Sequence, residues 1–138
     1  MKYIIVTQTY PPRIGGMQNV MASISERLAS IKDTHVFPDH FLSKKNNFSN
    51  SQLQIHNNFS PKLLRPFIKK YLIDKVYKDN DVVICDSWKS ISAVPSKIKK
   101  IFVLAHGQEF LSTNKKFGLI KKSLDRASCI ICSSNYTE

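Results

Sequence analysis

Short apolar runs alternate with amphipathic stretches along most of this 138-residue chain. The first run, Tyr3 to Thr7, is rich in β-branched and aromatic residues and predicts a strand. The full set of predicted strands is 3–7, 35–37, 53–55, 81–85, 100–104 and 129–132. Several of these runs are continuously apolar, which is typical of strands buried on both faces of a parallel sheet.

Helical periodicity occupies the intervals between most of these strands. Apolar residues recur at spacings of three and four from Met17 to about Ser30, which predicts a helix there. Further helices are predicted at 61–78, with an interruption or restart at Pro66, at 90–94 and at 115–126. The remaining region, 41–59, is expected to be mostly irregular. Strands that alternate with helices predict one α/β domain over residues 1–138, with a Rossmann-like, doubly wound parallel sheet.

The loop between the first strand and the first helix is a candidate anion site. Gly15 and Gly16 immediately precede the helix, whose N-terminus presents unpaired N–H groups and the positive end of its dipole. Paired glycines let a phosphate or carboxylate approach the backbone, and Arg13 adds a cation. The alternative is a tight turn that only requires positive φ. The sequence contains no dinucleotide fingerprint and no phosphate-binding P-loop.

Two further candidates follow predicted strands, at the edge where α/β proteins bind ligands. His106 can hydrogen-bond a ligand, Gly107 allows close approach, and Glu109 can accept from ligand hydroxyls. Asp86 and Ser87 can bind ligand hydroxyls, and Trp88 can stack on a ring of the ligand. The structural alternatives are a hydrogen-bonded core histidine, a tryptophan that plugs the edge, and an aspartate that caps the next helix.

The charge is strongly positive, because 21 Lys and Arg face 10 Asp and Glu for a formal net charge of +11. Such a protein attracts phosphorylated small molecules, anionic lipid or nucleic acid. The predicted helix at 61–78 carries six basic residues around an apolar stripe and can lie on an anionic membrane. The alternative is a solvated basic face above a stripe that packs on the sheet. No nucleic-acid-reading motif is present, so nucleic acid is not an expected partner, and a basic nucleic-acid-binding α/β domain is the less favoured alternative function.

The cysteines and the hydropathy favour a cytoplasmic location, with peripheral contact at the inner membrane face as the membrane alternative. Cys129 and Cys132 have CxxC spacing, but they lie in an apolar run that predicts a buried strand, and with Cys85 they complete no metal set. No metal is therefore expected. The opening apolar run is too short for a signal peptide, and no stretch of about 20 apolar residues occurs.

Three segments in order resemble the N-terminal, acceptor-side domain of the family 4 (group 1) retaining glycosyltransferases, which have the two-domain GT-B fold. They are Tyr10-Pro-Pro-Arg-Ile-Gly-Gly-Met, the apolar strand followed by His106-Gly-Gln-Glu, and Leu124-Asp-Arg-Ala-Ser-Cys-Ile-Ile-Cys-Ser-Ser-Asn-Tyr-Thr. Each segment alone is weakly specific, whereas the ordered set spans almost the whole chain.

The resemblance implies transfer of a hexosyl group from a nucleotide-diphosphate sugar to a glycan or lipid-linked acceptor, with retained configuration and without a metal or other cofactor. It also implies that the Gly15–Gly16 loop approaches the donor diphosphate and the acceptor, and that His106 assists at the reaction centre.

The family's second domain supplies the nucleotide pocket, a diphosphate-binding Arg/Lys pair and a Glu-x7-Glu motif, none of which occurs in this sequence. The final residues, 133–138, resemble the entry to a helix without the helix. We therefore expect a truncated half, or one that pairs with a separate chain carrying the donor domain. In both cases this chain is expected to be inactive in isolation.

Overall fold

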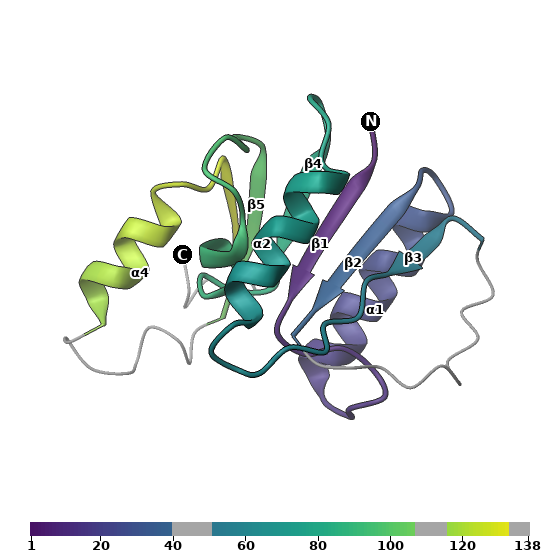
Figure 1. Ribbon diagram of the computed structural model, residues 1–138, viewed down its shortest axis with the longest axis horizontal. Helices are drawn as coiled ribbons and strands as arrows, with labels where there is room; N and C mark the ends of the chain where they lie inside the picture. Colours follow the sequence, from purple (N-terminus) through teal and green to yellow (C-terminus); the bar gives the residue numbers. More distant parts are fainter. Residues whose placement is uncertain (40–50, 107–115, 133–138) are drawn as a thin grey trace.

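A computed structural model describes residues 1–39, 51–106 and 116–132. Its centre is a six-stranded sheet in the order β3-β2-β1-β4-β5-β6, in which every neighbouring pair is parallel (Figure 1). The strands are β1 Tyr3–Thr7, β2 Thr34–Pro38, β3 Leu53–Ile55, β4 Val82–Cys85, β5 Ile101–Ala105 and β6 Cys129–Cys132. Each of the six predicted strands is present, and their bounds differ from the predicted ones by a residue at most.

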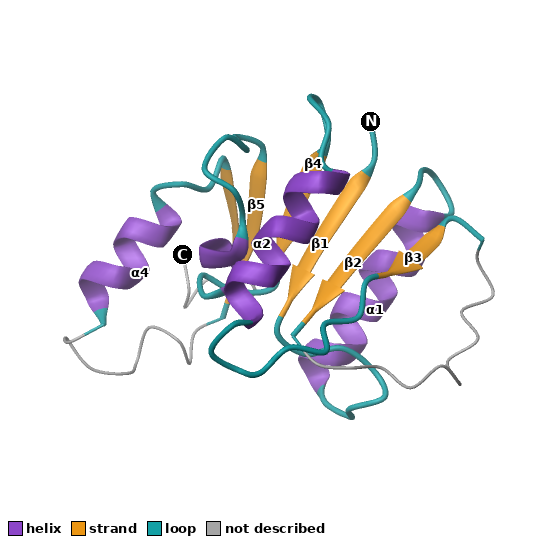
Figure 2. Cartoon of the chain, in the orientation of Figure 1, coloured by secondary structure: helices purple, strands orange, loops and turns teal. Residues whose placement is uncertain are grey.

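Helices cover both faces of the sheet (Figure 2). They are α1 Gly16–Ala29, α2 Arg65–Val76, the short 3-10 helix η1 Ser90–Ala93 and α4 Phe117–Leu124. α1 packs on one face against β1, β2 and β3, whereas α2, η1 and α4 share the opposite face. The chain is therefore a doubly wound, Rossmann-like α/β domain, as the sequence predicts.

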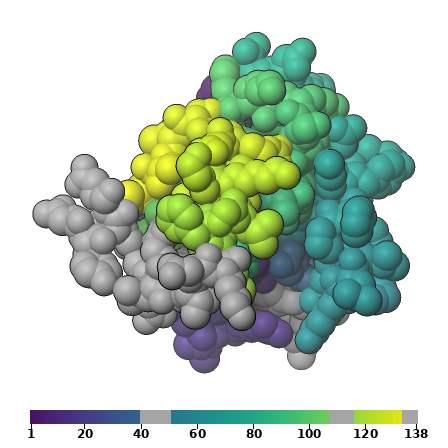
Figure 3. All heavy atoms as spheres, turned by 90° about the vertical axis from the view of Figure 1, so that its left-hand side faces the viewer, coloured from purple at the N-terminus to yellow at the C-terminus, as the bar shows by residue number. Residues whose placement is uncertain are grey.

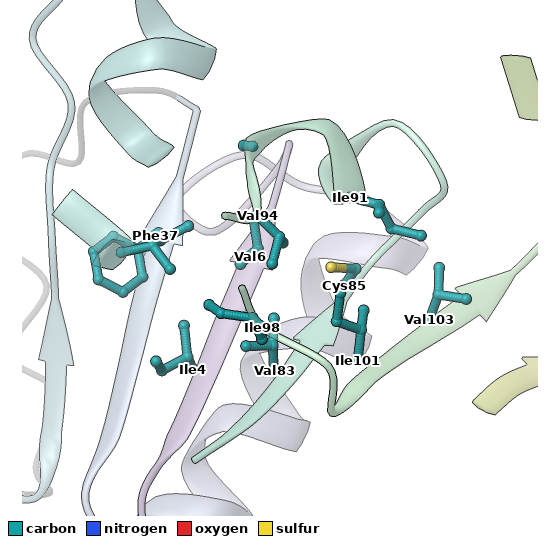
Figure 4. Close-up of a cluster of buried hydrophobic side chains, with 12 residues drawn as sticks. Ile4, Val6, Phe37, Val83, Cys85, Ile91, Val94, Ile98, Ile101 and Val103 are labelled. Carbon is teal, nitrogen blue, oxygen red and sulfur yellow. The ribbon is translucent and has the colours of Figure 1, made fainter. Parts of the chain in front are cut away.

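Alternate residues of the central strands point to opposite faces and create two apolar cores. Ile4, Val83 and Ile101 belong to the larger core, which also takes in η1 and the inner side of α2 (Figure 4). Ile5 and Met21 belong to the smaller core beneath α1. β1 and β2 each contribute to both cores, and all five residues of β2 and four of the five of β1 are buried.

α2 begins four residues later than the sequence predicts. Pro61 to Leu64 form a turn, in which the carbonyl of Pro61 accepts from the N–H groups of Leu64 and Arg65. Pro66 then lies in the first turn of the helix, where its missing N–H removes no intrahelical bond. The interruption predicted at Pro66 is therefore the start of the helix.

The expectation that the apolar face of this helix covers the sheet is only partly correct. Leu72, Val76 and Tyr77 pack against the larger core. Phe67 and Tyr71 face solvent, with exposed fractions of 72% and 57%. The sequence pattern failed here because α2 carries apolar residues on two opposite sides, so the pattern does not say which side is inward.

The expectation that 129–132 is a buried strand with buried cysteines is wrong. β6 is the edge strand beside β5, and Cys129, Ile130 and Ile131 are exposed while Cys132 is half-buried. An apolar run in a parallel sheet predicts burial only where helices cover both faces and strands flank both sides. β6 has a neighbour on one side alone.

Two histidines and a phenylalanine hold β3 and the following residue against β2. Nδ1 of His35 lies 2.8 Å from Nε2 of His56, and the His56 ring stacks on Phe37 with centroids 4.4 Å apart. Burial, with a smaller contribution from His35, lowers the pKa of His56 to about 4. Burial also lowers the pKa of His35, and the charge of Lys2 lowers it further.

These shifts predict acid sensitivity of the fold. The folded-state pKa of His56 lies below the unfolded value of 6.5, so below pH 6.5 the unfolded chain binds a proton that the folded chain does not. The free energy of unfolding should therefore keep its full value above pH 6.5 and decrease as the pH drops toward 4. Urea unfolding at intervals between pH 7 and about pH 5, above most of the carboxylate range, measures this slope.

His56→Phe keeps a flat ring on Phe37 and removes one titrating group. We expect this variant to have a shallower slope over the same interval, with the remainder due to His35. An unchanged slope would show that the pair does not sense the pH.

Candidate functional site

The strand order places a topological switch point between the carboxyl ends of β1 and β4. From β1 the chain goes on to β2 on one side, and from β4 it goes on to β5 on the other. In open α/β sheets such a switch point is where ligands bind, because the connections leave in opposite directions. Asp86 to Trp88 follow β4 directly, and Gln8 follows β1.

Asp86 connects the ends of β1 and β4 at this switch point. It is 3% exposed, and its Oδ2 accepts from the backbone N–H of Gln8 at 2.7 Å and lies 2.8 Å from Oγ1 of Thr7. Its Oδ1 accepts from the hydroxyl of Ser90, the first residue of η1. Both carboxylate oxygens therefore hold protein donors together. No side chain caps η1, so the alternative that Asp86 caps the next helix is wrong. The carboxylate instead anchors the residues after β1 to the Ser90 side chain, and ligand binding by Asp86 stays a prediction.

Three buried polar atoms around the carboxyl ends of β4 and β5 have no hydrogen-bond partner among the described residues. They are Oγ of Ser87, Nε1 of Trp88 and Nε2 of His106. Buried polar atoms in native proteins are nearly always paired, so each such group calls for an explanation. β4 and β5 are hydrogen-bonded neighbours, so the residues that carry these three atoms follow adjacent strands at the carboxyl edge of the sheet. Hydroxyl or phosphate oxygens of a ligand would provide the partners that they lack.

Lys69 is a member of this edge that sequence reasoning missed. It is 2% exposed, its Nζ donates to the carbonyl of Thr7 at 3.0 Å, and it forms an ion pair with Asp39 just after β2. In the sequence, Lys69 is one of six basic residues in the predicted helix 61–78. The available signal was its phase, because Lys69 lies four residues before the core residue Ile73 on the same side of α2.

The predicted glycine pair lies at the same edge, at the N-terminus of α1. Gly15 is the N-cap, with an extended φ of 167°, and no described glycine lies in the left-handed region of φ, so the tight-turn alternative does not explain the pair. A Cβ on Gly15 would meet only the flexible end of the Gln18 side chain, which can move aside, and a Cβ on Gly16 would meet no atom within 4 Å. Packing of the described residues therefore demands a glycine at neither position.

The other predicted site residues are placed as follows. Arg13 is exposed in the loop before α1, Trp88 is half-buried with Nζ of Lys89 5.7 Å from its ring centroid, and His106 is half-buried. Gly107 and Glu109 lie outside the described residues. The structure therefore brings the glycine pair, Asp86, Trp88 and His106 to a single edge of the sheet.

The described residues offer little for metal or thiol chemistry. No group of three potential metal ligands occurs among residues 1–39, 51–106 and 116–132. Burial, and then the charge of Asp86, raise the pKa of the Cys85 thiol well above its ordinary value, so this cysteine stays protonated at neutral pH.

Comparisons with family models, with curated proteins and with solved structures find no match for this chain. The functional assignment therefore depends on the residues and geometry of the edge itself.

Removing the Asp86 carboxylate should destabilise the protein. Asp86→Ala leaves the Gln8 N–H and the Ser90 hydroxyl without their acceptor in a buried place, whereas the Thr7 hydroxyl keeps the carbonyl of Thr9 at 2.7 Å. The substitution should lower the free energy of unfolding by about 2–4 kcal/mol. Urea denaturation at neutral pH measures the loss.

Asp125→Asn is the matched control, because Asp125 pairs with Lys121 on the exposed surface of α4. Its effect should stay below about 0.5 kcal/mol. Equal effects of the two substitutions would contradict the anchoring role of Asp86.

Proposed function

We propose that this domain is the acceptor-side half of a nucleotide-sugar-dependent glycosyltransferase, and that its ligands occupy the carboxyl edge of β1, β4 and β5. The observation that carries the proposal is the set of unpartnered buried polar atoms of Ser87, Trp88 and His106 at this edge. Sugars and phosphates are the small molecules that match such a set, because they present many hydroxyl and phosphate oxygens in a small volume.

The N-terminus of α1 suits the diphosphate of a sugar nucleotide. In glycosyl transfer the leaving nucleoside diphosphate gains negative charge, which fixed N–H dipoles and nearby cations stabilise. Gly16 begins α1, and no side chain covers it. Arg13, exposed in the preceding loop, is the cation closest to it in sequence.

His106 is the residue that we assign to the reaction centre. It follows β5 directly and leaves Nε2 without a partner among the described residues. An imidazole nitrogen can donate to, or accept from, a hydroxyl of the transferred sugar as that sugar develops charge. Retention of configuration and hexosyl transfer belong to this proposal through the resemblance of the three sequence segments.

A glycan or lipid-linked acceptor is the partner expected at this edge, and a donor-binding half is expected to complete the cleft. In the family that the sequence resembles, the nucleoside pocket belongs to that second half. We therefore expect weak nucleotide-sugar binding by the 138-residue chain and no turnover.

Gly16→Val tests the proposal at its most specific point. The new side chain meets nothing in the fold, so stability should change by less than about 1 kcal/mol, whereas ligand access to the α1 N-terminus is blocked. Titration of the ¹⁵N-labelled protein with UDP-glucose and with GDP-mannose should shift the amide resonances of Gly15 and Gly16, and Gly16→Val should weaken binding by about tenfold or more.

Gly118→Val is the matched control, because Gly118 lies in the first turn of α4 and is equally open. It should bind like the wild type. Absence of binding to any nucleotide sugar, or equal binding by both valine variants, would refute the proposed site.

A further inference from the structure

α2 carries apolar residues on two opposite sides. Leu72, Ile73 and Val76 face the core. Leu64, Phe67 and Tyr71 follow one another at spacings of three and four on the outward side, with exposed fractions of 51%, 72% and 57%. A helix at the surface of a globular protein normally presents charged and polar residues there. The outward stripe therefore needs an explanation other than folding.

The turn before α2 extends this surface. Phe59 and Leu63 are 78% and 87% exposed. Together with Leu64, Phe67 and Tyr71 they form what we term the outer surface of α2. Single exposed apolar residues are ordinary, whereas a contiguous group marks a place of interaction. In Figure 3 the teal atoms of this region form the outermost layer at the right of the molecule.

Cations flank this outer surface. Lys62, Lys70 and Lys75 are exposed, and Nζ of Lys75 lies 4.5 Å from the centroid of the Tyr71 ring. Asp74 is the one acidic residue of α2, and its charge is paired with Lys97 at 2.8 Å.

The other two cations of the helix are used internally. Lys69 is buried in its ion pair with Asp39, and Nε of Arg65 donates to the carbonyl of Ser60. The charge available to a partner of the outer surface is therefore positive and is carried by lysines.

We propose that the outer surface of α2 binds an anionic lipid bilayer, with the aromatic and leucine side chains in the interface and the lysines at the headgroups. Aromatic rings and leucines flanked by lysines are the composition of helices that lie in the membrane interface. Protein–protein interfaces are instead depleted of lysine and enriched in arginine, which argues against a protein partner here. No described helix is long and apolar enough to cross a bilayer, so the contact is peripheral.

Both components should be needed for binding. The long lysine side chains can extend to the headgroup phosphates while their stems cover apolar surface, and each adds electrostatic attraction to an anionic leaflet. Phe67 and Tyr71 supply the apolar area that enters the acyl boundary. Because exposed charges are screened, binding should weaken in about 0.5 M NaCl.

Cosedimentation of the full 138-residue chain with lipid vesicles tests the proposal. Vesicles of about three parts phosphatidylcholine to one part phosphatidylglycerol should bind the protein at least about tenfold more tightly than pure phosphatidylcholine. The double variant Phe67→Ser/Tyr71→Ser and the triple variant Lys62→Gln/Lys70→Gln/Lys75→Gln should each weaken binding to the mixed vesicles by about tenfold or more.

Val20→Ser/Ile31→Ser is the matched control, because it removes two exposed apolar side chains from α1 and the residues after it, on the opposite face of the sheet. It should bind the mixed vesicles like the wild type, and unfolding curves should show that all variants are folded. Three results would each overturn the proposal: no binding to mixed vesicles, equal binding to both vesicle types, or an equal loss in the control. Nucleotide-sugar binding by the double variant should be unchanged, so this test and that of the proposed function fail independently.

Discussion

Two buried aspartates fix β1 against β4, and the remainder of the domain is arranged around that seam. Asp81, before β4, accepts from the backbone N–H groups of Lys2 at 2.9 Å and Lys78 at 2.8 Å. Asp86, after β4, accepts from Gln8 and lies within hydrogen-bond distance of Thr7. A register slip by one residue would exchange the two faces of β4 and would separate both carboxylates from their donors. The charge-assisted bonds at the two ends thus reinforce the register that the apolar residues between them require.

This seam is also where the connections diverge, so the element that fixes the fold defines the candidate site. Asp86 holds the residues that follow β1 and β4 by hydrogen bonds. Lys69, on α2, donates to the last carbonyl of β1, and its charge is balanced by Asp39. Both groups have their hydrogen-bonding capacity directed into the protein. The buried atoms without a partner among the described residues belong to Ser87, Trp88 and His106, which follow Asp86 and β5. A binding edge is preorganised when the groups that hold the fold are fully hydrogen-bonded and neighbouring polar atoms stay available to a ligand.

The sequence predicts the sheet well because its strands are short apolar runs separated by clear breaks, and this signal is local. It places His106 and Gly16 at one edge because in a parallel sheet every strand's carboxyl end lies there. It failed for β6 because burial depends on neighbours that a local run does not encode. It failed for Lys69 and Phe67 because the rotation of α2 about its axis is decided by the packing of Ile73 and Val76 against the sheet.

That rotation connects the two sides of α2 functionally. The inner side brings Lys69, in the first two turns of the helix, to the carboxyl edge of β1, so Leu64 and Phe67 at the start of the same helix lie toward that edge as well. A bilayer bound to the outer surface of α2 would therefore lie near the carboxyl edge of the sheet, where Ser87, Trp88 and His106 are found. Folding places no demand for an aromatic residue at 67 or 71, because a charged side chain there would cost no core contact. An acceptor carried on a lipid would meet such a site at the headgroup level, and a free sugar acceptor would gain nothing from the outer surface of α2.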